Sequence, residues 1–496
     1  MSYARKAIRG SFIILLMSGI AALIAYATRM ILARNLSPSE YGLFYAVFTF
    51  MTFLLLFFRD WGLDTALVKF IAEFKAKNEN DKIKTAIVSV LSIKLVSSVV
   101  LGVFFFLMSD FFAEHYFRNP LASSFMKILC IYVVANALYD GLRSTFQGFQ
   151  KMMLYSTIQS ITNTVTLVLI VVFIYFGLNV FVPVLAYTFS FVFMMFFLFP
   201  LSLRNFNFFK YKFSEFNLVS KRLLFFGIPV LLTTIGSTFI GYTDTIMLTY
   251  FRSLEEVGVY NVVLPSALIF LFFGVSLSSV LLPLISELWA KKDLVRITEG
   301  LRLLYKYSFV AVTPFLLTIF VFAGIFINLF FGKAYVSGIV AFQILLIGVL
   351  FYSLAQINNT ALSAIGKPKV VTKIVLFAAL LNVVLNMFLI PKYGIGGAAF
   401  STSLSYLVVL VFSTLQITKN FALKVPYFQW FKTLFSAFVF IAVIGVIKTV
   451  LVINPWLELF ISFSVALLIY VFLVYVTKVI DFEELKKYLA LVYKKP

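Results

Sequence analysis

The sequence is dominated by long apolar runs separated by short polar segments. Runs of 18 or more mostly apolar residues recur along all 496 positions, and each is long enough to cross a ~30 Å hydrocarbon layer as a helix. We count fourteen such spans, at approximately residues 11–33, 43–72, 85–108, 123–142, 154–177, 180–202, 223–250, 259–288, 307–330, 338–363, 371–390, 396–417, 432–452 and 457–477. The pattern predicts an all-α, multi-pass membrane protein whose first span is a retained helix.

A segment near the start of the chain is repeated 216 positions later. Residues 24–47 and 240–263 share seven of 24 positions. The identical pairs are Ile24/Ile240, Tyr26/Tyr242, Leu32/Leu248, Ser37/Ser253, Glu40/Glu256, Gly42/Gly258 and Val47/Val263. Such self-similarity predicts two copies of one structural unit, with function located between them.

Counting spans assigns six helices to each copy. We expect an N-lobe over residues 1–210, a C-lobe over 211–425, and helices 13 and 14 with a basic cytoplasmic tail over 426–496. Because six is an even number, the two lobes should run in the same direction, related by an axis along the membrane normal and enclosing a central cavity.

The net charge is +21, and its distribution along the chain indicates the orientation in the membrane rather than affinity for nucleic acid. With the N-terminus inside, the inner segments hold 31 of the 41 Lys and Arg, and the outer loops hold five. This asymmetry predicts a cell-membrane protein with both termini in the cytoplasm. A single Cys excludes an internal disulfide, and a single His leaves little for histidine-based catalysis.

Charged residues within the first-lobe spans are candidates for a substrate site, because each is costly in hydrocarbon. They are Arg29, Arg59, Asp60, Asp64 and Lys94. If the second helix ends near Arg59, then Arg59, Asp60 and Asp64 are interfacial, whereas a longer helix would make them line a vestibule. Arg29 either extends to the outer headgroups or faces the cavity, and for Lys94 a cavity position and a strained reach to the interface stay open.

Other polar residues suggest pairing or a second site. Asp140 and Arg143 are three residues apart and can pair with each other. In the second copy, four oxygen-bearing residues suit a hard monovalent cation such as sodium, or a proton. They are Asp244, Asn382, Asn386 and Thr402. The alternative for this set is hydrogen bonding between packed helices.

Several motifs resemble those of oligosaccharide flippases, the polysaccharide transporters of the multidrug/oligosaccharidyl-lipid/polysaccharide superfamily. They are the paired turns RNLSPSEYG and RSLEEVGVY, the YTD before the second turn, and LRSTFQG at 142–148. The resemblance implies two six-helix lobes around a cavity that opens alternately to each side. It also implies a sodium site at Asp244, Asn382, Asn386 and Thr402, although Asn386 stands where the related lipid II flippases carry an acid.

These observations favour a flippase that moves an undecaprenyl- or dolichyl-pyrophosphate-linked oligosaccharide to the outer leaflet, with the fixed cations replacing the water around the pyrophosphate. The alternative from the same fold is an ion-coupled multidrug or cation antiporter. A membrane glycosyltransferase, polymerase or ligase is disfavoured, because the outer loops are too short to cover a donor. We therefore expect a monomeric transporter that is not an enzyme, with a lipid-linked oligosaccharide as partner and no cofactor beyond a possible coupling ion.

Overall fold

The computed structural model describes residues 3–421, 423, 426–450 and 454–480, which form helices joined by short turns. The predicted basic tail, apart from its first residues, lies outside this range. The chain divides into two compact units, Met1–Val262 and Val263–Pro496. The three-part division at residues 210 and 425 stays a prediction.

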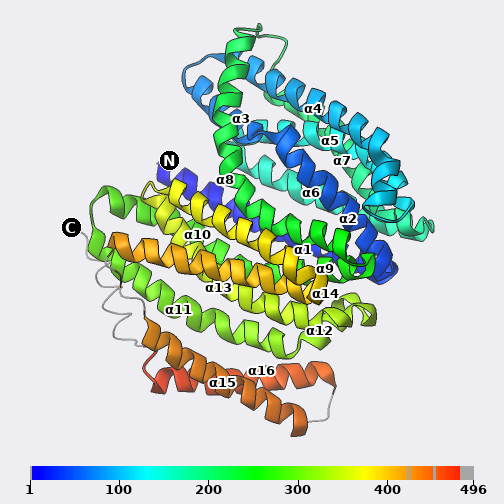
Figure 1. The fold of residues 1–496 in the computed structure, drawn as a ribbon. Coiled ribbons are helices and arrows are strands. Elements are labelled where there is room, and N and C mark those ends of the chain that lie inside the picture. The colour runs from blue at the N-terminus through cyan, green and yellow to red at the C-terminus, as the bar shows by residue number, and fades with distance from the viewer. Residues whose placement is uncertain (1–2, 422, 424–425, 451–453, 481–496) are drawn as a thin grey trace. The chain divides into compact units, whose positions relative to one another are not determined.

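The first unit is a bundle of helices (Figure 1) in which α5 packs against α2, α3, α4, α6 and α7. Its elements are α1 (Tyr3–Asn35), α2 (Pro38–Leu55), the π-helical segment η1 (Leu56–Asp60), α3 (Leu63–Ala76), α4 (Asn80–His115), α5 (Leu121–Gly148), α6 (Met152–Tyr175), η2 (Asn179–Phe181), α7 (Val182–Asn205) and α8 (Phe216–Phe251). Helix α1 packs along α6, and α8 contacts α2, α3 and α4. Helix α9 (Leu254–Leu268) begins in this unit and ends in the next.

The second unit is built around the paired helices α13 and α14. Its elements are η3 (Ile269–Leu271), α10 (Phe272–Ala290), α11 (Leu294–Val321), α12 (Ala323–Phe331), η4 (Lys333–Gly338), α13 (Ile339–Ala364), α14 (Pro368–Phe421), α15 (Tyr427–Val450) and α16 (Pro455–Val476). Helices α15 and α16 lie side by side and contact α11 (Figure 1). They correspond to the two predicted spans outside the repeat.

The all-α membrane architecture is confirmed. Within the described residues, twelve helices are long and apolar enough to cross a bilayer. Helix α14 covers two predicted spans, 371–390 and 396–417. Gly394, with φ 54°, interrupts the helical backbone between them. Helix α8 occupies the predicted seventh span and includes residues 232–238, whose side chains lie outside the described set. The count of fourteen spans stays a prediction.

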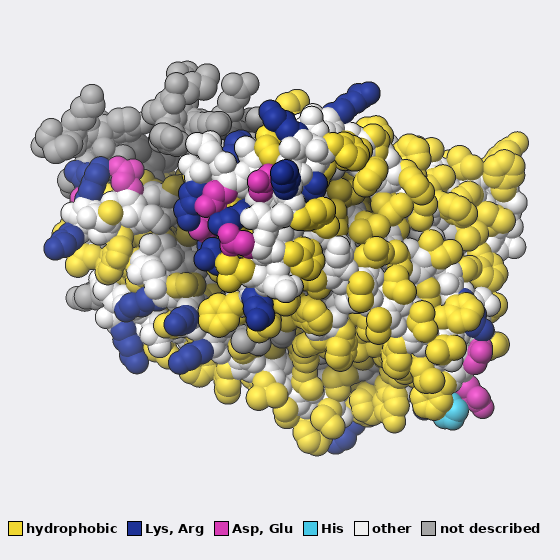
Figure 2. Space-filling view, turned by 90° about the horizontal axis from the view of Figure 1, so that it is seen from above, with side chains coloured by type: hydrophobic (Ala, Val, Ile, Leu, Met, Phe, Trp, Pro, Cys, Tyr) yellow, Lys and Arg dark blue, Asp and Glu magenta, His cyan; other side chains and the backbone are white. Residues whose placement is uncertain are grey.

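The surface of the protein is apolar enough to face lipid. Figure 2 shows hydrophobic side chains over most of the visible face, with charged side chains gathered in a few places. Phe196, Phe438 and Leu468 are each about two-thirds exposed or more. Such extended apolar exposure is typical of a surface in contact with acyl chains rather than with water.

The repeat is visible in how the second helix of each copy begins. Ser37 caps α2, accepting from the backbone N–H of Glu40 at 3.3 Å, and the Glu40 carboxylate accepts from the backbone N–H of Ser37 at 2.9 Å. In the second copy, the backbone N–H of Glu256 donates to the Ser253 hydroxyl, also at 3.3 Å. The conserved spacing of Ser and Glu within this one chain therefore encodes the same helix start twice.

The predicted second span, residues 43–72, is not one continuous helix. The structure divides it into α2, the π-helical segment η1 and α3, with Trp61 (φ 35°) and Gly62 (φ 66°) between η1 and α3. Apolar periodicity could not reveal this break, because both halves keep a buried apolar face. Gly62 supplies the left-handed backbone at a low steric cost. The predicted eighth span is likewise divided, into α9, η3 and α10.

Candidate functional site

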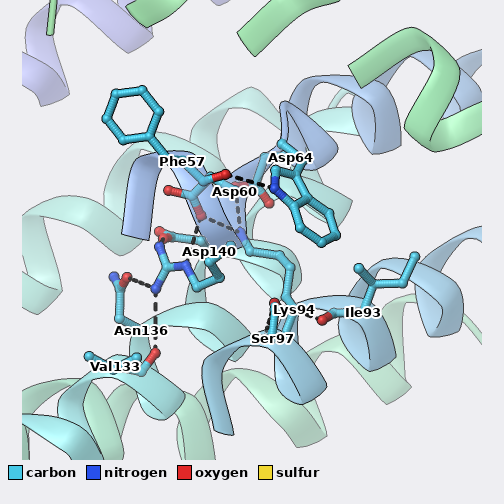
Figure 3. A network of polar contacts seen from close by, with 11 residues as sticks. Phe57, Asp60, Asp64, Ile93, Lys94, Ser97, Val133, Asn136 and Asp140 are labelled. Atoms are coloured by element: carbon cyan, nitrogen blue, oxygen red, sulfur yellow. Dashed lines mark hydrogen bonds and ion pairs between the residues drawn. The ribbon is translucent and has the colours of Figure 1, made fainter. Parts of the chain in front are cut away.

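A network of charged side chains lies at the break between α2 and α3 (Figure 3). It joins five charged side chains from four elements of the first unit, namely Arg59 and Asp60 of η1, Asp64 of α3, Lys94 of α4 and Asp140 of α5. Four of these were predicted as site residues from the sequence alone. The second helix neither ends at Arg59 nor runs on unbroken. It is interrupted at Trp61 and Gly62, and a further helix, α3, follows.

The irregular backbone places Arg59 and Asp60 inside the bundle. In η1 the helix widens to π geometry, which is common at functional sites and shifts the facing of the residues that follow. The Trp61 indole N–H donates back to the Phe57 carbonyl at 2.8 Å, holding the turn closed. Gly62 then lies against the backbone of Gly227 on α8, where a Cβ on Gly62 would come within 2.2 Å of the Gly227 carbonyl oxygen. A side chain at either glycine would therefore displace the turn.

Arg59 is held by several partners at once. Its Nε donates to Asp60 Oδ1 at 2.8 Å, and Nη1 donates to Asn136 Oδ1 at 2.7 Å and to the Val133 carbonyl at 3.4 Å. Nη2 lies 3.6 Å from Asp140 Oδ2. With 4% of its side chain exposed, this guanidinium has most of its hydrogen-bonding capacity occupied.

Lys94 is the second base of the network and is fully buried. Its Nζ donates to Asp64 Oδ2 at 2.6 Å and lies 3.8 Å from Asp60 Oδ1. The other oxygen of Asp64, Oδ1, is buried without a hydrogen-bond partner among the described residues. The long stem of Lys94 is thus directed into the bundle, toward Asp64 and Asp60.

The network covers its bases and leaves its acids accessible. The side chains of Asp60, Asp64 and Asp140 are 29%, 33% and 29% exposed, whereas the two bases are almost completely covered. Arg59 and Lys94 were predicted to contact an anionic cargo, yet both are already paired with carboxylates. The expected pairing of Asp140 with Arg143 is wrong. Asp140 faces Arg59, while Arg143 donates to the Tyr155 carbonyl at 3.2 Å and stacks over its ring.

Arg29 of α1 has a different environment. Its Nη1 donates to the Asn261 carbonyl at 3.2 Å, and its guanidinium carbon lies 4.5 Å from the centre of the Tyr45 ring. The phenol groups of Tyr41 and Tyr187 also lie near this guanidinium. Among the described residues, no carboxylate lies within 4.0 Å of Arg29, the limit for an ion pair. Arg29 therefore points inward among aromatic residues rather than extending to the headgroups.

The predicted cation set is distributed over the two units. Asp244 belongs to the first unit and accepts a hydrogen bond from the buried Tyr260 hydroxyl at 2.5 Å. In the second unit, Asn382 Nδ2 donates to Thr402 Oγ1 at 3.0 Å, and Asn386 Nδ2 donates to Asn382 Oδ1 at 3.1 Å. The three residues of the second unit are therefore hydrogen-bonded to one another, and all four residues are buried.

Sequence reasoning did not find the partner of Asp140, the contact of Asn136 with Arg59, or the hydrogen bond of Tyr260 to Asp244. Asn136 was not considered, Asp140 was assigned to the wrong partner, and Tyr260 was not singled out. Asn136 and Asp140 are four residues apart, on one face of α5, which is the same spacing that drew attention to Asn382 and Asn386. Tyr260 gave no polar signal of its own, since its ring also suits the core.

Comparison with known proteins identifies the family. The family model described as polysaccharide biosynthesis protein matches residues 7–289, more than half of the chain, and the MatE model matches residues 229–388. This chain belongs to the polysaccharide biosynthesis family of the multidrug/oligosaccharidyl-lipid/polysaccharide flippase superfamily. The resemblance inferred from the sequence motifs is therefore confirmed, and the relatives and structural neighbours reported below are transporters or flippases rather than enzymes where their names give a function.

Relatives of this polysaccharide biosynthesis family protein occur in archaea. An uncharacterised membrane protein of Methanocaldococcus jannaschii is 30% identical over the full length of both chains. A protein of Haloferax volcanii named as a probable low-salt glycan biosynthesis flippase is 24% identical over 52% of each chain. Among solved structures, the lipid II flippase MurJ in an inward closed conformation has a TM-score of 0.78 at 17% identity, covering 94% of this chain and 98% of that one. An inward-facing multidrug transporter of the same superfamily has a TM-score of 0.63 at 15% identity, covering 82% and 98%.

Proposed function

We propose that this flippase-family protein moves a polyprenyl-pyrophosphate-linked oligosaccharide from the cytoplasmic to the outer leaflet by alternating access. The prenyl chain, undecaprenyl or dolichyl, would stay in lipid while the head group passes through the protein. The family and the flippase relatives support a lipid-linked oligosaccharide in general. The positive-inside bias supports cytoplasmic termini, with substrate loading from that side.

Arg29 is the observation that carries the proposal for an anionic head group. An arginine away from lipid headgroups is costly unless it is compensated, and Arg29 has an aromatic surround without a carboxylate partner among the described residues. A diphosphate would supply the missing charge through forked, charge-assisted hydrogen bonds. Arg59 and Lys94, by contrast, are already neutralised, so Arg29 is the strongest of the predicted substrate contacts.

The coupling ion is proposed separately. Asp244, Asn382, Asn386 and Thr402 remain candidates for sodium, since all four present buried oxygen atoms. The amides and hydroxyl of the second unit already bond to one another, so an ion would have to replace some of these bonds.

A second candidate function, export of cationic compounds, is favoured by one observation. The accessible side of the charge network is acidic, with three partly exposed carboxylates over two buried bases. Carboxylates in a membrane-embedded site suit organic cations. The two functions differ in the charge of the cargo and can be separated in one assay.

The test uses purified full-length protein in liposomes. A fluorescent polyprenyl-pyrophosphate oligosaccharide is placed in one leaflet, and its accessibility in the other leaflet is followed with and without a sodium gradient. Parallel vesicles are loaded with a fluorescent cationic dye. Translocation of the lipid-linked glycan with no dye movement supports the flippase. Dye movement without glycan translocation would replace it with the antiporter.

A further inference from the structure

The charge network contains one more acid than it has bases. Asp60, Asp64 and Asp140 face Arg59 and Lys94, so the fully ionised cluster carries one surplus negative charge. All five residues belong to helices of the membrane bundle, where an uncompensated charge is costly. The surplus therefore requires a positive counter-charge or neutralisation.

The distances assign the surplus to one carboxylate. Asp64 has a hydrogen bond of 2.6 Å from Lys94, and Asp60 has one of 2.8 Å from Arg59. Asp140 has only an ion contact of 3.6 Å with Arg59, beyond hydrogen-bond distance. The other terminal nitrogen of Arg59, Nη1, is bonded to Asn136 and Val133. Asp140 is therefore the least compensated acid of the network.

The arrangement does not suit a metal ion as the counter-charge. Among the described residues there is no group of three or more His, Cys, Asp or Glu side chains placed to hold a metal. The Lys94 ammonium and the Arg59 guanidinium occupy the space between the carboxylates, and they would repel a cation there. A proton on a carboxylate removes the surplus without needing a coordination shell.

We propose that Asp140 carries an exchangeable proton, making the charge network a proton-binding site of the first unit. When Asp140 is protonated, the two positive charges of Arg59 and Lys94 balance the two negative charges of Asp60 and Asp64. Arg59 keeps its hydrogen bonds to Asp60 and Asn136. Because the Asp140 side chain is 29% exposed, a proton can reach it from the polar side of the network. A proton bound from one side of the membrane and released to the other would couple transport to the proton gradient.

The titratable and charged groups around Asp140 come from several elements. They are Arg59 and Asp60 of η1, Asp64 of α3, Lys94 of α4, and Tyr132 and Tyr139 of α5 itself. Helices α6 and α7 also pack on α5 and bring Tyr155 and Tyr187, which face Tyr139 and Tyr132. Within this set only the three aspartates lose their charge by taking up a proton, so variants of these residues locate it.

Infrared difference spectroscopy of the purified full-length protein, titrated over pH in lipid nanodiscs without any substrate, tests the proposal. We expect a carbonyl-stretch band of a protonated carboxylic acid equivalent to one group, absent from Asp140→Asn and retained in the matched control Glu73→Gln. Glu73 lies on α3 and pairs with Lys77 at the surface. A band that persists unchanged in Asp140→Asn, or no such band at any pH where the protein is folded, overturns the proposal.

A second variant covers the case in which Asp140→Asn does not fold. Asp140→Glu keeps the carboxyl group, and the band should move to a new frequency. An unchanged band in this variant also contradicts the proposal. Since no lipid-linked glycan is present, a negative result here leaves the flippase proposal standing, and failure of glycan translocation leaves this one standing.

Discussion

Gly42 and Gly258, which occupy equivalent positions in the two copies of the repeat, lie backbone against backbone. A Cβ on Gly42 would come within 1.9 Å of the Leu254 carbonyl oxygen, and a Cβ on Gly258 would come within 1.9 Å of the Pro38 carbonyl oxygen. Pro38 and Leu254 are themselves equivalent in the repeat. The contact is therefore reciprocal, as expected for two related segments that meet about a twofold axis.

Alanine at either glycine should break this contact. The added methyl group has no room, because the atoms it meets belong to backbone, and we expect Gly42→Ala and Gly258→Ala each to lower the free energy of unfolding by about 1–3 kcal/mol. Steric-trapping measurements in bicelles would report the change. Gly241→Ala is the matched control, since nothing lies within 4 Å of its added Cβ. Equal stability of all three variants would show that the two segments do not meet in the protein as it exists in lipid.

We expect the contact between Gly227 of α8 and the turn at Trp61 to hold the neighbouring residue Arg59 in its place in the charge network. A Cβ on Gly227 would lie 2.4 Å from the Trp61 carbonyl oxygen. Gly227→Ala should displace the turn, and with it Arg59, whereas a substitution elsewhere on α8 should not. We expect the indole fluorescence of Trp61, compared with that in a Trp61→Phe background, to shift in Gly227→Ala. An unshifted spectrum together with normal glycan translocation would mean that the turn is not held by α8.

Lys94 and Asp64 should behave as a coupled pair. Lys94→Met leaves Asp64 without its nearest base, and loss of one partner of a buried pair costs about 3–5 kcal/mol. We expect the lower end of this range, because the Asp64 side chain is 33% exposed. The double variant Lys94→Met/Asp64→Asn should recover a large part of the loss in thermal stability. Additive effects of the two single changes would instead place the residues in separate interactions.

Much of the fold follows from one-dimensional patterns in the sequence. Apolar run length fixes the membrane helices, and the spacing of Ser37 with Glu40, repeated at Ser253 and Glu256, marks equivalent helix starts. The sequence left open whether the second helix ends near Arg59, and it gave no sign that the backbone of α8 lies against Gly62 at the break after Asp60. A glycine inside an apolar run is compatible with both a straight and a bent path.

The candidate site was predictable as a set of residues but not as a set of partners. Arg59, Asp60, Asp64 and Lys94 stand out because charge is rare in membrane helices. That Lys94 pairs with Asp64, and Arg59 with Asp60 and Asn136, depends on the rotation of each helix. Sequence spacing within one helix cannot specify that rotation relative to its neighbours. The resulting neutralisation of both bases changes which residue is left for an anionic cargo.

The central claim is that Arg29 contacts the anionic head group, and glycan translocation by Arg29→Ala in liposomes tests it most directly. The matched control is Arg143→Ala, which removes another guanidinium that stacks on a tyrosine and donates to a backbone carbonyl. We expect Arg29→Ala to lose at least ten-fold in translocation rate, about 1.4 kcal/mol or more in activation free energy, with Arg143→Ala close to wild type. Wild-type translocation by correctly inserted Arg29→Ala would contradict the account.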